Sequence, residues 1–333
     1  MKQSGPEFHI DFHDFVLEVH VIGYRTEGES IVILLKEGSR TFYSILIDDF
    51  CKRKGRRWIN RSIEILKSND VAALQMIIMT HPHEDHIRGM DNIINLFCDN
   101  NTMFFSPAHS FDIERQTVQL TDKEKSILKQ VRNINDTNRF FSNEVGVSLG
   151  GYSSLRAIYL YDNDDPDKQF PIIVEINALS PIASINDHKI SGKVLSPNDL
   201  SISTIICICD YYLLFASDAT NDHIDCLDSE TLSAVKFVKI PHHASDTSNH
   251  LLRFFSKDQL DYACSTSYHI GNSHLPNRAI LNQYSIVSRR VDYLGCKSDH
   301  KQKGPFGELC YSFRMGPTSM LSNVQSLGLV NCR

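Results

Sequence analysis

The stretch Thr80-His81-Pro82-His83-Glu84-Asp85-His86 places three histidines and an aspartate within six residues. It follows the apolar run 74–79 and precedes Ile87, Met90, Ile94 and Phe97, whose spacing is typical of one helix face. The sequence therefore predicts a strand, a loop and a helix in that order. Because neutral imidazole nitrogens and carboxylate oxygens are ligands of Zn²⁺, Mn²⁺ and Fe²⁺, the loop is a candidate metal site.

Length and composition limit the class of protein to which this loop can belong. The chain has 333 residues, 41% of them hydrophobic, which is enough for a full core in one large domain or two small ones. No apolar run approaches the roughly 18 residues of a membrane span, and the first residues lack the apolar core of a signal peptide. We therefore expect a soluble cytoplasmic protein with no membrane partner.

Cysteine usage and charge narrow the classes further. The nine cysteines are an odd number and mostly lie inside apolar runs, which favours buried free thiols in a reducing compartment. Cys207 and Cys209 alternate along an expected strand, so we expect them on opposite faces, unable to share a metal. The net charge of -6 argues against a protein whose whole surface binds nucleic acid, but it permits a local basic groove.

Strand patterns occur on both sides of the histidine loop. Residues 15–22, 30–35 and 43–48 predict three strands joined by glycine-bearing turns. His20 alternates with apolar neighbours, so it is expected on a strand face rather than as a ligand. In the second half, a hairpin at 201–216 leads to Asp218, and a strand at 235–240 leads to Pro241-His242-His243-Ala244-Ser245.

A basic run follows the third predicted strand. Five cations occur within six residues and are followed by the only tryptophan of the chain. One interpretation is a solvated loop. The other is a phosphate-binding patch beside an active-site mouth, with an aromatic ring available to stack on a base. The candidate residues are Lys52, Arg53, Lys54, Arg56, Arg57 and Trp58.

The His-x-His-x-Asp-His pattern at 81–86 resembles the signature of the metallo-β-lactamase superfamily. The two strand-rich halves, each ending in metal-type loops, are similar to its αββα architecture. The resemblance implies an α/β fold of four layers, in which two facing mixed sheets are flanked by helices. It further implies one domain over residues 1–333, with a variable helical insertion at about 98–150.

The resemblance also implies a ligand set for two divalent metal ions, Zn²⁺ or Mn²⁺. One metal would be held by His81 and His83, the second by Asp85 and His86, with Asp218 bridging both. Such a pair, ~3.5–4 Å apart, clamps the attacking and leaving oxygens and lowers the pKa of a bridging water. Asp48, at the end of the third strand, would accept a hydrogen bond from a ligand histidine and fix its tautomer.

One of the paired histidines would complete the second metal site. In an extended backbone, adjacent side chains point to opposite sides, so only one of the two can reach the metal. We predict His242, because the fixed φ of Pro241 would aim it from the strand end. His243 would then contact the substrate phosphate or an acidic neighbour.

Other motifs resemble the ComEC/Rec2 branch of the superfamily. They are Leu195-Ser196-Pro197-Asn198-Asp199-Leu200-Ser201, the Ser-Asp pair at 217–218, the Pro-His-His-x-Ser run at 241–245 and the Asn-Ser-His-x-Pro run at 272–276. The chain departs from the branch at Ala244, where glycine is usual, and by one extra residue after His274. A further ligand histidine found in β-lactamases and glyoxalases is missing, because that region offers only His109 and His188.

The branch implies phosphodiester cleavage, with a nucleic acid or nucleotide as the substrate class. Asp85, His243 and His274 are the predicted catalytic residues. His274 would be a cation or proton donor facing the phosphate, with Ser245 or Ser273 adding hydrogen bonds. Alternatively, His274 merely precedes a helix that begins at Pro276. A small-molecule hydrolase for a lactone, thioester or β-lactam, and a catalytically idle binding module, remain as alternative functions.

Overall fold

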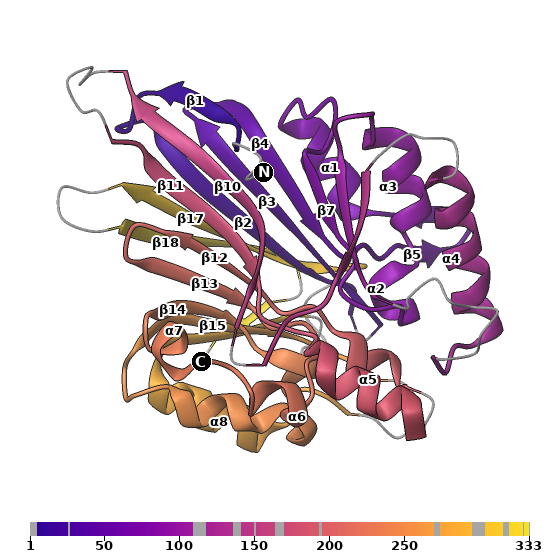
Figure 1. The fold of residues 1–333 in the computed structure, drawn as a ribbon. Helices are drawn as coiled ribbons and strands as arrows, with labels where there is room; N and C mark the ends of the chain where they lie inside the picture. The colour runs from indigo at the N-terminus through magenta and orange to yellow at the C-terminus, as the bar shows by residue number, and fades with distance from the viewer. Residues whose placement is uncertain are drawn as a thin grey trace.

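The computed structural model describes most of the chain, with gaps in several loops. The described residues are 5–25, 27–108, 118–135, 141–149, 151–163, 170–192, 195–269, 274–294, 304–315, 320–328 and 330–332. Within them the strands form two large mixed sheets and one small hairpin (Figure 1).

The first large sheet has eight strands among the described residues, in the order β18-β17-β2-β3-β4-β7-β8-β9. The predicted strands at 15–22, 30–35 and 43–48 are confirmed as the antiparallel neighbours β2, β3 and β4. From β4 to β9 the strands run parallel. The bounds are β2 (Phe15–Gly23), β3 (Glu29–Glu37), β4 (Arg40–Ile47), β7 (Met76–Ile78), β8 (Met103–Pro107), β9 (Phe141–Val145), β17 (Gly307–Met315) and β18 (Met320–Gly328).

The second large sheet has nine strands within the described ranges, in the order β1-β10-β11-β12-β13-β14-β15-β16-β19. The predicted hairpin is confirmed as β12 and β13, and β13 to β16 run parallel. The bounds are β1 (Glu7–Ile10), β10 (Ser153–Asp162), β11 (Ile172–Ala178), β12 (Thr204–Ile208), β13 (Tyr211–Phe215), β14 (Val235–Lys239), β15 (Leu260–Thr266), β16 (Ser288–Leu294) and β19 (Val330–Cys332).

Helices cover the outer face of each sheet. On the eight-stranded sheet they are α1 (Arg61–Ser68), α2 (Glu84–Ile87), α3 (Met90–Phe97) and α4 (Asp122–Asn135). On the nine-stranded sheet they are α6 (Asn221–Ile224), α7 (Ser229–Ser233) and α8 (Arg278–Val287), with 3-10 turns η2 (Pro241–Ala244) and η3 (Asp246–Phe254). Two further elements lie elsewhere: α5 (Ala183–Gly192) packs Ile185 against the core between the sheets, and the 3-10 turn η1 (Pro197–Leu200) packs Leu200 in a small cluster with Val118 and Leu195. No described helix is long and apolar enough to cross a membrane.

The two sheets share one apolar core. Leu17, Val19 and Ile33 of the eight-stranded sheet and Ile206 and Phe215 of the nine-stranded sheet belong to one buried cluster. Alternate residues of the same strands face the helices, as the period of two in a strand requires. The predicted four-layer α/β architecture, helices on sheet on sheet on helices, is therefore confirmed. The shared core supports the prediction of one domain, which stays a prediction.

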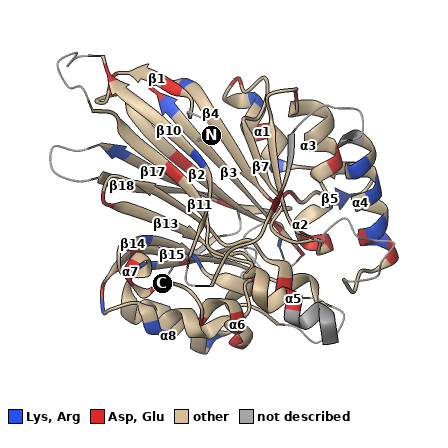
Figure 2. Cartoon of the chain, viewed as in Figure 1, with Lys and Arg blue, Asp and Glu red and all other residues tan. Residues whose placement is uncertain are grey.

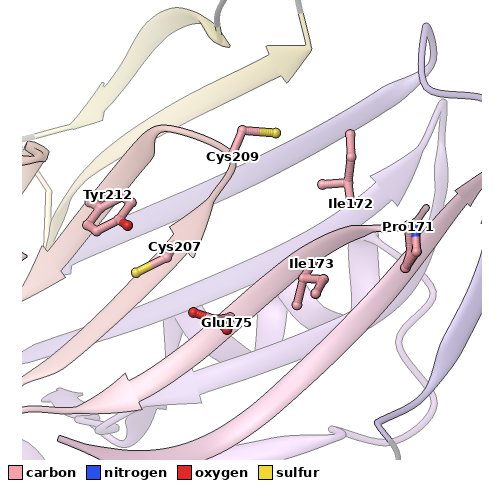
Figure 3. A pocket seen from close by; sticks show the side chains of 7 residues that line it. All are labelled: Pro171, Ile172, Ile173, Glu175, Cys207, Cys209 and Tyr212. Atoms are coloured by element: carbon pink, nitrogen blue, oxygen red, sulfur yellow. The ribbon is translucent and has the colours of Figure 1, made fainter.

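One expectation about the far end of the nine-stranded sheet is wrong. Cys207 lies in β12, but Cys209 follows the strand with a left-handed backbone, φ 53°. Both residues line one pocket with Glu175 and Tyr212, although their sulfur atoms point in different directions (Figure 3). Residues two apart on a strand share a face, so the expectation of opposite faces misapplied the period of two. Burial raises the pKa of Cys207 to about 12, so this thiol is held protonated.

Candidate metal site

Four loops meet at the carboxyl ends of strands from both sheets. Asp48 follows β4, residues 80–86 follow β7, Asp218 follows β13, and residues 241–245 follow β14 (Figure 1). β4 and β7 are parallel neighbours, as are β13 and β14. Because parallel neighbours end at the same edge of a sheet, and the two sheets face each other, residues far apart in sequence come together there.

The first ligand group combines His81, His83 and Asp218. One side-chain nitrogen or oxygen from each lies within 4.8 Å of the others. The Nε2 atom of His81 is 3.8 Å from Asp218 Oδ2, and the rings of His81 and His83 are 5.0 Å apart in a T-shaped arrangement. His81 and Asp218 are buried, whereas His83 is partly exposed.

The second ligand group combines Asp85, His86 and His243, again within 4.8 Å of one another. The Asp85 Oδ2 atom is 3.6 Å from His86 Nε2 and 3.4 Å from His243 Nε2. All three side chains are buried. Asp218 touches this group as well, because its Oδ1 atom lies 3.8 Å from His86 Nε2. Its two oxygens therefore face one histidine of each group.

The donor atoms in this region fit a pair of metal ions. His81 Nε2, His86 Nε2, His243 Nε2 and Asp218 Oδ1 are buried and have no hydrogen-bond partner in the structure. A buried polar atom without a partner costs roughly 1–3 kcal/mol, so four such atoms in one place need a common ligand. Nitrogen and carboxylate oxygen suit Zn²⁺ or Mn²⁺, which would be held by His81, His83 and Asp218 on one side and by Asp85, His86 and His243 on the other.

Hydrogen bonds behind the histidines set their orientation. His86 Nδ1 is 2.7 Å from Asp48 Oδ2, and the same carboxylate accepts bonds from the Thr80 backbone N–H and hydroxyl at 2.7 and 2.6 Å. His81 Nδ1 lies 3.0 Å from the Thr80 hydroxyl, which in turn accepts from Ser217. With both Nδ1 atoms occupied, the Nε2 atoms are directed into the site, as is usual for histidines that ligate a metal.

Behind His243 lies a group that the sequence analysis missed. His243 Nδ1 is 2.8 Å from the Thr266 hydroxyl, which donates to Glu29, and Glu29 pairs with Lys239 at 2.8 Å. Glu29, Lys239 and Thr266 are fully buried, within 2% exposure. The only sequence signal was a lysine inside the apolar run 235–240. Thr266 and Glu29 gave no signal, because their roles depend on β15 and β3 lying beside the β14 loop.

The prediction of an extended backbone at the paired histidines is wrong. His242 and His243 both have left-handed conformations, with φ of 48° and 52°, and Ala244 follows at 62°. The turn buries His243 against Asp85 and His86, in the place expected for His242. Pro241 fixes only its own φ and does not decide where the next side chain points. The His243 ring also stacks on Tyr268 at 5.3 Å.

His242 lies at the open edge of the first ligand group. Its Nε2 atom is 3.7 Å from Asp218 Oδ2 and 3.2 Å from Asn198 Nδ2, and its Nδ1 atom is 2.8 Å from the Thr247 hydroxyl. About a quarter of the side chain, 24%, is exposed. Asn198, from η1, belongs to the Ser-Pro-Asn-Asp run that the sequence analysis noted without giving it a role.

Charge in this region is dominated by buried carboxylates. The ion-pair partners of Asp85 and Asp218 in the described part of the chain are histidines. Burial by itself disfavours a charge on Asp218, but His242 and His243 hold its pKa well below the usual value. Burial lowers the pKa of His86, yet the nearby Asp85, Asp48 and Asp218 outweigh it and raise the pKa to about 10. Without a metal, the site therefore holds a proton on His86.

For His81 the pKa shifts in the opposite direction to that of His86. Burial is the main cause that lowers the pKa of His81 well below the usual range, and the positive charge of His86 acts in the same direction. A neutral imidazole has a free lone pair for a metal. The same carboxylates that favour a proton on His86 would favour a divalent cation, so we expect metal binding to release a proton.

Two glycines allow the histidine loop to lie where it does. A Cβ atom on Gly28 would come within 2.4 Å of the Phe50 ring and 2.6 Å of the Asp85 carbonyl oxygen. A Cβ atom on Gly89 would come within 2.1 Å of Asp49 Oδ2. Gly89 also separates α2 from α3, so the single helix face predicted for 87–97 is divided between two helices.

The remaining predicted residues lie outside the two ligand groups. The Ser245 hydroxyl accepts from the Thr247 backbone N–H and caps η3, which is a structural use. His274 is exposed, with its ring 5.6 Å from His269, and the helix after it begins at Arg278 rather than at Pro276. Ser273 and His109 lie outside the described residues.

The basic run forms a hairpin instead of a loop. β5 (Lys52–Lys54) pairs antiparallel with β6 (Arg57–Ile59), and Gly55 takes φ 63° in the turn. Trp58 is 60% exposed. Lys52 pairs with Glu27 at 3.0 Å, and Arg88, after α2, also lies 3.7 Å from Glu27, so ion pairs join the hairpin to the metal loop. β5 and α4 carry Lys and Arg on the same side of the molecule (Figure 2).

No protein-family model matches the chain, and no curated protein matches it in sequence. Distant similarity to solved structures was found. A diphosphatase of the PhnP family is 10% identical at a TM-score of 0.39, covering 84% of this chain and 87% of that one. The metallo-β-lactamase fold protein YhfI from Bacillus subtilis is 12% identical at 0.34, covering 78% and 74%. Zinc-bound PqqB from Methylobacterium extorquens is 8% identical at 0.29, covering 62% and 59%.

Proposed function

We propose that this protein is a metal-dependent hydrolase of the metallo-β-lactamase superfamily that cleaves phosphodiesters. The observation that carries the proposal is the position of Asp218, whose two oxygens lie 3.8 Å from histidines of two separate ligand groups. A carboxylate so placed fits the bridging ligand of a two-metal site. When bound, the two ions supply a water of lowered pKa and a clamp for the attacking and leaving oxygens.

The residues of the chain have distinct parts in this proposal. His243 is a ligand with Asp85 and His86, in place of His242, because it is the buried member of the pair. Asp48 and Thr266 hold the Nδ1 atoms of His86 and His243, so that each Nε2 atom is presented to a metal. Asp85 is the carboxylate ligand of this group, 3.6 Å from His86 Nε2 and 3.4 Å from His243 Nε2.

His242 and Asn198 are the proposed contacts to substrate. They lie 3.2 Å from each other at the exposed edge of the first group, where an ester must enter. His242 would donate a proton or hydrogen bond to a phosphate or leaving oxygen, and Thr247 would hold its other ring nitrogen. A phosphodiester has enough oxygen atoms to contact His242, Asn198 and both metals at once. We therefore favour it over an amide or a thioester.

Further features bear on the biological setting of the enzyme. Seven cysteines within the described residues are free thiols, which supports a reducing, cytoplasmic environment. The motifs at 195–201 and 241–245 support the ComEC/Rec2 branch. The β5–β6 hairpin supports a nucleic acid or nucleotide substrate, because its cations other than Lys52, which pairs with Glu27, are exposed together with Trp58 and can contact backbone and base.

The test is parallel activity and metal analysis. Protein loaded with Zn²⁺ or Mn²⁺ is expected to hold close to two ions per chain and to hydrolyse bis-p-nitrophenyl phosphate. Asp218→Ala is expected to lose this activity while keeping its unfolding temperature in chelator. Nitrocefin and a thioester serve as the alternative substrates. Turnover of either in preference to the phosphodiester, or full phosphodiesterase activity in Asp218→Ala, would overturn the proposal.

A further inference from the structure

A second cluster of ligand-type side chains lies on the face of the eight-stranded sheet that packs against helices. Glu18 and His20 are two residues apart on β2 and therefore share a face. Cys310 of β17 is the register partner of His20 and lies on the same face. One ligand atom from each of the three lies within 4.8 Å of the others.

We propose that Glu18, His20 and Cys310 form a separate binding site for one zinc-like divalent ion. His20 Nε2 is 3.6 Å from Glu18 Oε2 and 3.8 Å from Cys310 Sγ. Zinc lies about 2.0–2.2 Å from nitrogen and oxygen ligands and about 2.3 Å from sulfur, so tetrahedral ligands are roughly 3.4–3.6 Å apart. The two separations from His20 lie within a few tenths of an ångström of this range, and the Glu18 and Cys310 ligand atoms are within 4.8 Å of each other, so side-chain rotation can complete the geometry.

The histidine of this cluster is oriented in the same way as His86. Its Nδ1 atom is 2.8 Å from Glu308 Oε1, and Glu308 is held by Arg61 Nε at 2.7 Å. The carboxylate behind the ring leaves Nε2 directed at Glu18 and Cys310, an arrangement typical of metal-binding histidines. His20 and Glu308 are 8% and 5% exposed, so the geometry is held inside the protein.

Cations around the cluster set how strongly it would bind. Lys36 Nζ lies 3.2 Å from Glu18 Oε2 and also donates to Asn69, the residue after α1. The lysine competes with a metal for Glu18, so the site is expected to be weaker than the one at the strand ends. Three protein ligands of mixed nitrogen, oxygen and sulfur type leave a fourth position for water. Thiolate favours zinc or cobalt over magnesium and calcium.

Cobalt spectroscopy distinguishes this site from the one at the strand ends. Thiolate bound to Co²⁺ gives a charge-transfer band in the near ultraviolet, and the ligands at the strand ends include no sulfur. Chelator-treated protein titrated with Co²⁺ is expected to show this band after the tighter sites at the strand ends are filled, and to saturate it with one further equivalent. Cys310→Ser and His20→Gln are expected to lose it. Cys226→Ser, which changes another half-buried cysteine near acidic residues, is expected to keep it.

Two controls keep the result independent of folding and of the proposed function. The variants are compared by thermal unfolding in chelator, and Glu18→Gln, which retains the thiol, is expected to keep the band but weaken Co²⁺ binding about 10-fold or more. Hydrolysis by metal-loaded Cys310→Ser is expected to match the parent protein, because the cluster is separate from the strand-end site. A band that persists in Cys310→Ser, or no band in the parent protein at millimolar Co²⁺, would overturn the proposal.

Discussion

The candidate metal site at the strand ends and the cluster of Glu18, His20 and Cys310 share one arrangement of histidine and carboxylate but differ in how their charges are balanced. The first, the strand-end site, comprises His81, His83, Asp85, His86, Asp218 and His243. In each, a buried histidine has Nδ1 against a carboxylate, Asp48 for His86 and Glu308 for His20, and Nε2 facing further ligand atoms. At the strand ends four buried polar atoms lack partners. Around His20, Lys36 and Arg61 already neutralise the two glutamates.

The difference teaches that geometry alone does not predict how tightly a cluster binds a metal. A site whose carboxylates are paired only with histidines gains the full attraction of a divalent ion. In a site where lysine and arginine lie beside the carboxylates, these cations already neutralise part of the negative charge. A metal ion must then displace a cation before it gains the full attraction of the carboxylates. We therefore expect tight binding at the strand ends and weaker binding around His20, and the following predictions test this contrast.

The largest effect is expected from His243→Ala. It removes a buried ligand, so metal content should fall toward one ion per chain and phosphodiesterase activity should fall about 10³-fold, the equivalent of losing about 4 kcal/mol of transition-state stabilisation. His242→Ala is the matched control and should keep both ions while its activity falls. Metal content and turnover are measured together. The opposite pattern, with metal lost in His242→Ala alone, would show that the buried ring is not the ligand.

Asp48→Asn and Glu308→Gln together compare the carboxylate behind His86 with the carboxylate behind His20. Removing the charge behind His86 should weaken metal binding at the strand ends about 10- to 100-fold. Glu308→Gln is the corresponding change behind His20 and should leave that affinity unaltered, while weakening the Co²⁺ thiolate band. Competition with a chromophoric chelator measures both. If Glu308→Gln affected the strand-end metals equally, the two sites would not be independent.

Gly28→Ala tests how closely the histidine loop must pack. The new methyl would lie 2.6 Å from the Asp85 carbonyl oxygen and 2.4 Å from the Phe50 ring, so we expect a loss of about 1–3 kcal/mol in the free energy of unfolding. Metal affinity at the strand ends should fall as Asp85 is displaced. Gly146→Ala, whose methyl would be 3.4 Å from Ala183 Cβ, is the control. Denaturant unfolding with and without chelator separates the two effects.

Neutralising the β5–β6 hairpin should alter polymer substrates selectively. Changing its five cations to glutamine is expected to weaken nucleic-acid binding and to reduce the slope of log affinity against log salt by up to about 4. Hydrolysis of bis-p-nitrophenyl phosphate should change little. Lys257 and Arg278, exposed near α8, provide the control substitutions. An equal response of both substrates would mean that the hairpin does not bind the polymer.

The smallest effect is expected from Lys36→Met. Removing the cation beside Glu18 should tighten Co²⁺ binding at the His20 cluster by up to about fivefold, or about 1 kcal/mol. Binding at the strand ends should not change. Titration of the thiolate band measures Co²⁺ affinity at the His20 cluster, and metal retention during dialysis measures binding at the strand ends. Weaker Co²⁺ binding in this variant would contradict the competition between lysine and metal.

Much of the fold was readable because its signals are local. The apolar runs at 15–22 and 30–35 predicted β2 and β3, and the polar loop directly after the apolar run at 74–79 predicted where the candidate ligands gather. Errors arose where the backbone leaves regular structure. Left-handed φ angles at His242 and His243 meant that these neighbouring side chains did not alternate as they would in a strand, and neither residue is a glycine that would have signalled the turn.

By itself the sequence determined the ligand types and their order, because histidine and aspartate after apolar strands are recognisable one loop at a time. Only the tertiary structure decided which ring faces which carboxylate. Glu29, Thr266 and Lys239 meet behind His243 from three strands, and Cys310 meets His20 across 290 residues. Such contacts depend on strand register and on the facing of two sheets, which no local periodicity records, since each strand pattern is compatible with many partners.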